Sequence, residues 1–269
     1  MLPKCVSVMF RMDNEEMSTS LLILRARNEL ARRVAIVDPP KRMGRPRCMS
    51  PMAMLDKVMF MWRTGCQWSQ IPTDGMASYK TIFHRFNLWS KHRVFEDAFY
   101  TLATAYRQQR GNLALVVDTT SVKNVFGVDV CGRNHADRSR RATKVSLLAD
   151  ANGTPLTLAF HACNKNDCTT LRHLLDTAVA KTSASLASHA CLYADKGYDS
   201  ATNRQVCQRH QLEARIPRRG TPEGWSSVRY IVEVVFGRLD RFRRIIMRYD
   251  AGICNFKAFH YLACLTLFK

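Results

Sequence analysis

The sequence lacks three features that each mark a particular class of protein. No stretch approaches the roughly 18 consecutive apolar residues of a membrane-spanning helix. The opening apolar run from Val6 to Phe10 is broken by Arg11 before it reaches the length of a signal peptide. None of the ten cysteines forms a C-x₂-C pair, the spacing typical of a zinc site. We therefore expect a cytoplasmic protein, or a nuclear one in a eukaryote, with free and mostly buried thiols.

Acidic residues are scarce. The 269 residues include 22 Asp and Glu against 41 Lys and Arg, which gives a formal net charge of +19, and 29 of the 41 cations are arginine. The planar guanidinium group suits paired contacts with phosphate better than the lysine ammonium does. A large polyanion, above all a nucleic acid, is therefore the predicted partner. A basic surface that serves only solubility is the competing interpretation.

Composition divides the chain into three parts. Residues 1–47 are predicted to be a basic N-terminal arm and linker, because Pro39-Pro40 and a run of arginines to Arg47 interrupt regular structure. Residues 48–110 place apolar side chains at helical spacing and predict three helices, interleaved with cations and tryptophans. We interpret this part as a DNA-binding unit. The alternative is a helical bundle that only packs on the next domain.

Residues 111–269 show the alternating pattern of an α/β domain. Short apolar runs rich in branched side chains predict strands at residues 113–118, 144–150, 154–162, 190–194 and 213–216. Helical spacing predicts helices at residues 167–181, 200–210 and 226–248. The segment over residues 127–141, rich in Gly, Asn, His and Arg, is predicted to be a flexible basic loop. The fold class is therefore a mixed sheet flanked by helices, preceded by a small all-helical domain.

Three acidic residues are candidates for the chemistry. Asp118 and Asp195 each follow a predicted strand, and ligands collect at the carboxyl ends of neighbouring strands in sheets with crossover helices. Glu233 lies at the edge of the apolar stripe of the last helix, where a carboxylate needs a metal ion or Arg229 to neutralise it. The alternatives are turn or cap roles for the two aspartates and a surface ion pair between Arg229 and Glu233.

Three carboxylates form a donor set that suits Mg²⁺, which prefers hard oxygen ligands. Two such ions about 3.5–4 Å apart can stabilise the attacking and leaving oxygens of a phosphoryl transfer. Together with a predicted nucleic-acid partner, the sequence indicates a metal-dependent phosphoryl-transfer site at Asp118, Asp195 and Glu233.

Five segments carry a family resemblance: Met61–Pro72, Tyr79–Phe86 with Trp89, Val117–Lys123, Tyr193–Asp199 and Val232–Arg244. In this order they resemble the DDE transposases of bacterial insertion sequences, specifically the insertion-sequence-five group. The resemblance runs from about residue 42 to residue 269. It implies an RNase H-like catalytic domain over residues 111–269, with its three acids at Asp118, Asp195 and Glu233.

The resemblance also implies an activity and its partners. Such an enzyme binds two Mg²⁺ (or Mn²⁺) ions, hydrolyses a phosphodiester at the transposon end and transfers the freed 3′ hydroxyl into target DNA. The implied partners are double-stranded DNA, as terminal inverted repeats and as target, and further copies of the chain on that DNA, in the bacterial nucleoid. The candidate DNA-binding residues are Arg229, Arg238, Arg243, Arg244, Arg248, Lys123, Lys144, Arg63 and Arg85.

Two positions depart from the family pattern. Ser226 stands where a tyrosine is usual three residues before Arg229, and Asp240 stands where a basic or amide residue is usual seven after Glu233. An extra carboxylate there weakens DNA contact or raises the proton affinity of Glu233. These departures favour a second interpretation, a catalytically silent DNA-binding protein descended from such a transposase. A nuclease on RNA or RNA–DNA hybrids is a third, and it gives no reason for the helical unit. Asp167 is interpreted as a helix cap.

Overall fold

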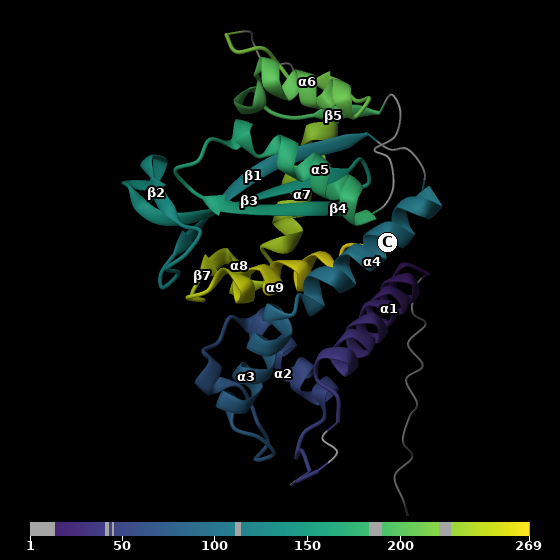
Figure 1. Cartoon of the computed structure of the whole chain (residues 1–269), viewed down its shortest axis with the longest axis vertical. Helices are drawn as coiled ribbons and strands as arrows, with labels where there is room; N and C mark the ends of the chain where they lie inside the picture. Colours follow the sequence, from purple (N-terminus) through teal and green to yellow (C-terminus); the bar gives the residue numbers. More distant parts are fainter. Residues whose placement is uncertain are drawn as a thin grey trace, which may run out of the picture.

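The structure is a computed structural model that describes residues 14–40, 43–44, 46–110, 114–182, 190–220 and 227–268. Its elements, in chain order, are α1 (Asn14–Val37), α2 (Pro51–Thr64), α3 (Tyr79–Lys91), α4 (Val94–Arg110), β1 (Leu115–Asn124), β2 (Gly132–Asn134), β3 (Arg140–Asp150), β4 (Pro155–Ala162), the short helix η3 (Asp167–Thr169), α5 (Leu171–Thr182), β5 (Cys191–Tyr193), the short helix η4 (Lys196–Tyr198), α6 (Ala201–Arg209), β6 (Glu213–Arg215), α7 (Ser227–Leu239), α8 (Arg243–Ile246), β7 (Met247–Arg248) and α9 (Ile253–Cys264). In Figure 1 the sheet forms the upper part of the molecule and the helical unit α2–α4 the lower part.

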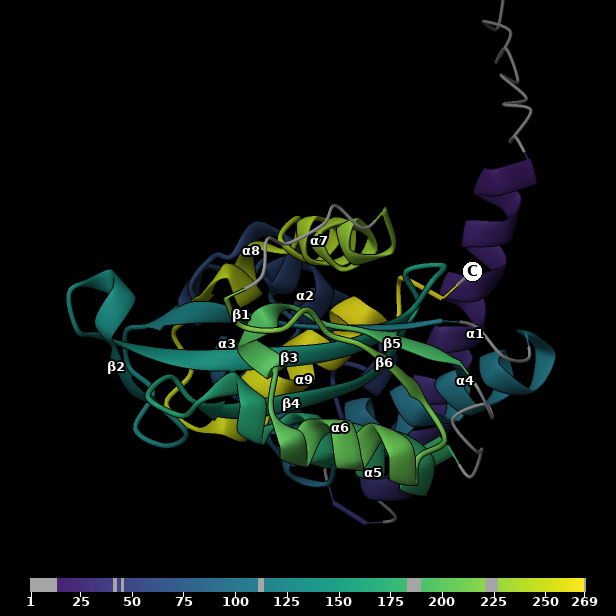
Figure 2. The same ribbon diagram turned by 90° about the horizontal axis from the view of Figure 1, so that it is seen from above.

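The sheet is mixed, as the sequence predicted. Its main strands lie in the order β4-β3-β1-β5-β6, with β4, β3 and β1 antiparallel and with β5 and β6 parallel to β1. Helix α7 covers one face of this sheet, and α5 and α6 cover the other (Figure 2). This strand order and these flanking helices confirm the expected RNase H-like fold.

The helical unit has the three helices predicted for residues 48–110. Helix α2 begins where the Ser50 side chain accepts a hydrogen bond from the backbone N–H of Ala53, a typical N-cap. It ends at Gly65, whose φ of 73° lies in the left-handed region that glycine adopts without strain. The local chemistry of these residues therefore sets both ends of the helix.

Helix α9 joins the helical unit to the sheet. Its Phe259 stacks on Phe86 of α3, with ring centroids 4.5 Å apart, while Phe256 meets Phe160 of β4 at 6.1 Å. These side chains belong to one hydrophobic cluster that continues from the helical unit into the sheet. The boundary predicted at residue 110 is therefore not a break in the packing.

Helix α1 packs on the rest of the molecule. Ala26, Leu30 and Val34 are buried in the main hydrophobic cluster, on a helix that lies beside α4 (Figure 1). Asp38 follows the helix and is 3% exposed; it binds Arg47, Arg85 and the indole N–H of Trp89. Residues 26–38 of the predicted arm are therefore part of the core, because an apolar helical face and a buried carboxylate hold them against the helical unit.

Other expectations about the sheet domain need correction. Strand β1 continues past Asp118 to Asn124, because its backbone pairs with β3 along its whole length. The long helix predicted over residues 226–248 ends at Leu239, where the chain turns and Phe242 stacks on Trp62 of α2 with ring centroids 3.7 Å apart. The basic segment over residues 127–141 includes β2, and α9 had not been predicted.

Two expectations from composition can be compared with the structure. No helix in the described ranges is long and apolar enough to cross a membrane. The described cysteines are all free, as expected, but only Cys163, Cys207 and Cys264 are buried, so the prediction of mostly buried thiols is wrong.

Candidate active site

The first two acids of the predicted site lie on neighbouring strands. Strands β1 and β5 are parallel, with Leu115 opposite Leu192 and Val116 opposite Tyr193. Continuing this register by two residues brings Asp118 opposite Asp195, whose backbone is still extended with φ −76° and ψ 170°. The strand pairing therefore places two half-buried carboxylates side by side, although they are 77 residues apart in sequence.

Both carboxylates lie on the face of the sheet that α7 covers. Along β1, Val116 packs in the hydrophobic cluster that contains the buried residues of α7, and Val117 packs in the cluster on the α5 side. Along β5, Tyr193 packs against the first cluster and Ala194 belongs to the second. Side chains alternate between the two faces of a strand. Asp118 and Asp195 therefore both point toward the α7 side.

Local hydrogen bonds orient these two carboxylates. Oδ1 of Asp118 accepts the backbone N–H of Thr119 at 2.7 Å, and Oδ1 of Asp195 accepts that of Gly197 at 2.9 Å, which caps η4. A Cβ atom on Gly197 would lie 2.9 Å from Asp195 Oδ1, so a larger residue there would displace this carboxylate. In the described part of the chain no Lys or Arg forms an ion pair with Asp195, which leaves its negative charge available to a cation.

A buried tyrosine supports the pair from the other face of the sheet. The Tyr198 hydroxyl lies 2.6 Å from Thr119 Oγ1, which lies 2.6 Å from Ser146 Oγ on β3. Burial, together with the nearby Asp118 and Asp195 carboxylates, raises the pKa of Tyr198, so the phenol stays protonated at neutral pH. Sequence reasoning missed this residue, although it ends the Asp195-Lys-Gly-Tyr198 segment that carried the family resemblance.

Glu233 lies on the facing helix. Its side chain is exposed, one turn before Phe236 and two turns before Asp240 on the same flank of α7. Phe236 and Asp240 line a cavity of about 150 Å³ together with Thr120 of β1. This flank of α7 therefore faces the part of β1 that follows Asp118, which is the side on which a third carboxylate is needed.

The three acids do not form a closed cluster. Among the described residues no group of three His, Cys, Asp or Glu side chains is arranged to hold a metal ion. What the structure assembles is a pair, Asp118 and Asp195, with Glu233 exposed on the helix that covers their face of the sheet. The donors are all carboxylates, the ligand type that Mg²⁺ and Mn²⁺ prefer.

Asp240, the departure from the family pattern, lies at the end of the same flank. Partial burial raises the pKa of its carboxyl group, so it takes up a proton more readily than an ordinary aspartate. Its distance of two helical turns from Glu233 keeps it beside the candidate site without joining the carboxylate pair. Ser226 and the side chain of Arg229 lie outside the described residues.

Three of the predicted DNA-binding residues are exposed. Lys123 lies near the end of β1 with 55% of its side chain exposed and its Nζ 3.8 Å from Asp137 Oδ2, and Arg63 and Arg243 are exposed on α2 and α8. Arg243 lies against the end of α2, because a Cβ atom on Gly65 would lie 2.9 Å from Arg243 Cβ. Arg63 is in the last turn of the same helix.

Two of the predicted DNA-binding arginines are buried. The side chain of Arg244 is 6% exposed and binds Asp250 at 3.1 Å. That of Arg248 is fully buried; it binds the Asp129 carboxylate and the backbone carbonyl of Asp250. Their assignment to DNA binding is wrong in this fold, because a phosphate cannot reach a guanidinium group enclosed in the interior.

Two further candidates are occupied by acidic partners. Arg85 is 19% exposed and binds the buried carboxylate of Asp38. Lys144 is 16% exposed; its Nζ lies 2.8 Å from Asp167 Oδ1. Neither cation is free to neutralise a DNA phosphate, so the structure reassigns both to internal ion pairs.

Arg238 lies on the wrong flank of α7 to accompany Glu233. Five residues along a helix correspond to roughly 140° of rotation. Accordingly, Nη1 of Arg238 lies 3.8 Å from the Cβ position of Gly153, in the turn after β3. That turn adjoins the amino end of β1, because Leu115 pairs with Asp150. Because α7 also ends at Leu239, Arg238 and Arg243 do not share the single helix predicted over residues 226–248.

Asp167 does not cap a helix. The cap of η3 is Asn166, whose side chain accepts the backbone N–H of Cys168. Asp167 instead binds Lys144 and approaches Nε2 of His161 at 3.6 Å. Burial works to raise the pKa of Asp167, but the hydrogen bonds and charges of His161 and Lys144 leave it below its ordinary value.

Comparison with known protein families gives two matches along the chain. A model described as a putative transposase of the IS4/5 family matches residues 30–99, and a model described as a transposase DDE domain matches residues 109–268. The second match contains Asp118, Asp195 and Glu233, and the first contains most of the helical unit.

Two transposase sequences and one solved structure are also similar to this chain. A putative transposase for insertion sequence element IS402 of Burkholderia cepacia is 33% identical over 147 residues, which are 53% of this chain and 70% of that protein. The transposase for insertion sequence element IS1106 of Neisseria meningitidis serogroup B is 33% identical over 134 residues, 45% of this chain and 44% of that protein. The crystal structure of a pre-cleavage Mos1 transpososome aligns with 96% of this chain and 99% of its own, with a TM-score of 0.30 and 8% identity.

Proposed function

The chain belongs to the DDE transposases of the IS4/5 type, and we propose that it cleaves phosphodiester bonds at the ends of a mobile DNA element and transfers the freed 3′ ends into target DNA. The observation that carries this proposal is the register of β1 with β5. It sets Asp118 beside Asp195 on the face covered by α7, where Glu233 is exposed.

The carboxylates suit divalent cations. We propose that Asp118 and Asp195 hold two Mg²⁺ or Mn²⁺ ions, with Glu233 as the third carboxylate. When bound, such ions activate water and neutralise the charge that develops on the phosphate oxygens. Cations outnumber acids in this chain, so most carboxylates could find a cationic partner. No Lys or Arg in the described part of the chain forms an ion pair with Asp195 or Glu233, which supports a role for these two carboxylates in binding metal ions.

The residues around the pair hold it in place. The strand backbone and the N–H groups of Thr119 and Gly197 fix the two carboxylates before DNA arrives. The Tyr198 hydroxyl secures Thr119 from beneath. Catalysis in such a site depends on positioning and charge neutralisation, so prearranged carboxylates lower the reorganisation needed in the reaction.

Double-stranded DNA is the proposed substrate, as terminal inverted repeats and as target, bound by more than one copy of the chain. The formal net charge of +19 supports a polyanionic partner. Lys123, Arg63 and Arg243 are the exposed members of the predicted set, and we propose that they contact backbone phosphates. Arg229 stays a prediction from the sequence.

The test is plasmid nicking by the Asp118→Asn variant. The substrate is a supercoiled plasmid that carries the inverted repeats flanking the gene, incubated with Mg²⁺ or Mn²⁺. We expect nicking to fall by more than the roughly 10–100-fold that loss of an outer-shell partner of a metal costs. Binding to the same DNA without metal should persist, because the change removes one charge and little volume.

Asp176→Asn is the matched control, the same chemical change at an exposed aspartate of α5 on the other face of the sheet. It should nick like the wild type. Undiminished nicking by Asp118→Asn would refute the assignment of Asp118. A wild-type chain that binds DNA but does not nick it with either metal would favour the catalytically silent interpretation instead.

A further inference from the structure

A second candidate site lies away from the carboxylate pair. A cavity of about 490 Å³ opens between α4, the edge strand β4, α5 and α9. The cavity lies at the β4 edge of the sheet, and β3 separates β4 from β1, the strand that carries Asp118. None of Asp118, Asp195 and Glu233 lines it.

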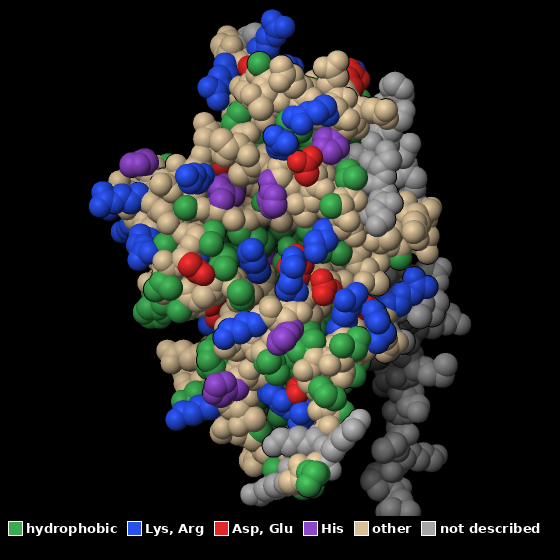
Figure 3. Space-filling view, in the orientation of Figure 1, with side chains coloured by type: hydrophobic (Ala, Val, Ile, Leu, Met, Phe, Trp, Pro, Cys, Tyr) green, Lys and Arg blue, Asp and Glu red, His purple; other side chains and the backbone are tan. Residues whose placement is uncertain are grey.

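Cationic side chains dominate the lining. Figure 3 shows Lys and Arg side chains gathered across the middle of this face. The cations that line the cavity are Lys91, Arg93, Lys181 and Lys257, together with the titratable His173. Glu96 is the acid that lines the cavity. Its Oε1 atom lies 3.0 Å from Arg93 Nη2 and 4.0 Å from Lys181 Nζ. With His173 neutral, the lining therefore has a net charge of +3.

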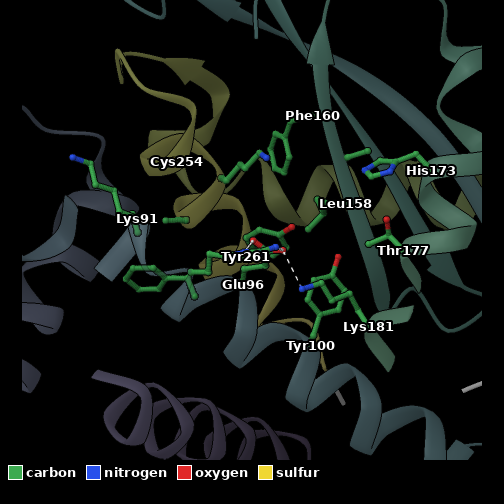
Figure 4. A pocket seen from close by; sticks show the side chains of 16 residues that line it. Lys91, Glu96, Tyr100, Leu158, Phe160, His173, Thr177, Lys181, Cys254 and Tyr261 are labelled. Atoms are coloured by element: carbon green, nitrogen blue, oxygen red, sulfur yellow. Dashed lines mark hydrogen bonds and ion pairs between the residues drawn. The ribbon is translucent and has the colours of Figure 1, made fainter. Parts of the chain in front are cut away.

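Two of these lysines have no acidic partner. Within the described ranges, Lys91 and Lys257 form no ion pair. The Lys257 ammonium lies 5.6 Å from the ring centroid of Phe160, on the wall of the cavity. Glu96 is already shared by Arg93 and Lys181, so it does not neutralise these two charges. Figure 4 shows Lys91 at the rim, with its ammonium group directed away from the other lining side chains, so an anion inside the cavity would meet Lys257 and an anion at the rim would meet Lys91.

The remaining walls add aromatic and apolar surface without further negative charge. Burial raises the pKa of Tyr100 to about 12 and that of Tyr261 well above its usual value, so both phenols stay protonated. Figure 4 shows these rings beside the Glu96–Lys181 pair, with Phe160 on the opposite wall. The volume is at the small end of ligand pockets, which suits a phosphate group and its sugar and excludes a whole duplex.

We propose that this cavity binds two backbone phosphates of one DNA strand at the β4 edge of the sheet, one at Lys257 on the cavity wall and the next at Lys91 on the rim. The proposal rests on the proposed function, since it takes DNA as the polyanion. Lysine suits this role because its compact ammonium group binds phosphate as a point charge and requires no single geometry. A strand held here is engaged independently of the one held at the carboxylates.

The test is the salt dependence of DNA binding by the full chain without metal. The probe is a 20-bp duplex of unrelated sequence, since backbone contacts carry no sequence information. Each phosphate contact contributes about −0.9 to the slope of log K against log salt. The Lys91→Ala/Lys257→Ala double variant should therefore have a slope shallower by about 1.8. A slope equal to that of the wild type would overturn the proposal.

Arg209→Ala/Arg215→Ala is the matched control. It also removes two positive charges, from exposed side chains on α6 and β6 that do not line the cavity. Its slope should match that of the wild type. If both double variants lose the same slope, the effect comes from net charge alone and the cavity is not a site. Equal thermal midpoints for all the proteins would show that folding is unchanged.

Inorganic phosphate distinguishes the source of the ligand. At constant ionic strength it should protect the wild type against thermal unfolding only at millimolar concentration. Micromolar protection that the lysine double variant lacks would identify a small phosphate ligand and refute the DNA assignment. Because none of these measurements requires cleavage, they separate failure of this site from failure of the proposed activity. If the wild type nicks the plasmid but the lysine double variant keeps the wild-type salt slope, the phosphate-site proposal is refuted and the proposed activity stands.

Discussion

Replacing Arg248 with methionine separates a structural arginine from a DNA-binding one. In the structure this side chain is fully buried. Its guanidinium group donates to the carbonyls of Asp250 at 3.1 Å and Ala251 at 3.0 Å, and to Thr143 Oγ1 at 3.0 Å. It also binds the Asp129 carboxylate. Methionine fills much of the same space and restores none of these contacts.

The size of the effect follows from which acceptors water can reach after the change. The Asp129 carboxylate is 45% exposed and Ala251 is exposed, so both regain water. Asp250 and Thr143 are buried, and each loses a donor that water cannot replace. Two such groups at 1–3 kcal/mol each give a loss of about 3 kcal/mol in the free energy of unfolding. For a chain of this length that lowers the thermal midpoint by about 5 °C.

Urea unfolding followed by circular dichroism measures this loss. The urea midpoint should fall, while the slope of the free energy of unfolding against urea concentration stays constant, because the surface exposed on unfolding is unchanged. Arg241→Met is the control, since Arg241 is exposed, and its change should stay within about 0.5 kcal/mol. A variant of Arg248 that keeps wild-type stability and loses DNA affinity would refute the reasoning and restore the DNA contact predicted from the sequence.

Two further predictions concern buried titratable groups. Asp38→Ala should lower the free energy of unfolding by about 2 kcal/mol, because it leaves Arg85 and the Trp89 N–H without their acceptor. The control Asp56→Ala, which removes an exposed ion pair, should change this free energy little. Equal urea midpoints for the two variants would contradict the prediction. Burial lowers the pKa of His260 from 6.5 to about 4, so as the pH falls through this window the unfolded chain gains a proton that the folded protein excludes, and stability falls. The free energy of unfolding, measured with urea at pH 7 and pH 4.5, should therefore differ less between the two pH values in His260→Phe than in the wild type. An equal difference in both proteins would show that His260 is not held neutral.

The elements that the sequence predicted well carry a local signal. Helices α2 and α3 repeat buried apolar residues at helical spacing, and strands β3 and β4 are apolar runs buried on both faces of the sheet. Helix α9 gave no such signal, because Phe256 packs toward the sheet while Phe259 packs toward α3, so apolar residues occur on every side. The extension of β1 beyond Asp118 escaped prediction because its polar residues are held by pairing with β3, a partner remote in sequence.

The candidate site was predictable to the extent that strand ends converge. Asp118 and Asp195 were selected because each follows an apolar run, and parallel pairing of β1 with β5 brings such positions together. The roles of the arginines were not predictable, since residue type does not reveal burial. Arg243 is exposed and Arg248 is fully buried, five residues later, because Asp129 supplies a partner 119 residues away.

The placement of acids explains how so basic a chain can keep a site for cations. Most of its buried acids are neutralised from within the fold: Asp38 by Arg85, and Asp250 by Arg244. Burying each ion pair costs desolvation free energy, and the attraction between its two charges offsets that cost. Such a pair leaves no net charge for a ligand. Asp195 is different, because the described part of the chain supplies it with a backbone N–H and no cation. Because Asp195 is half-buried, solvent can balance its charge in the free protein, and a divalent ion can replace that solvent without breaking an internal ion pair.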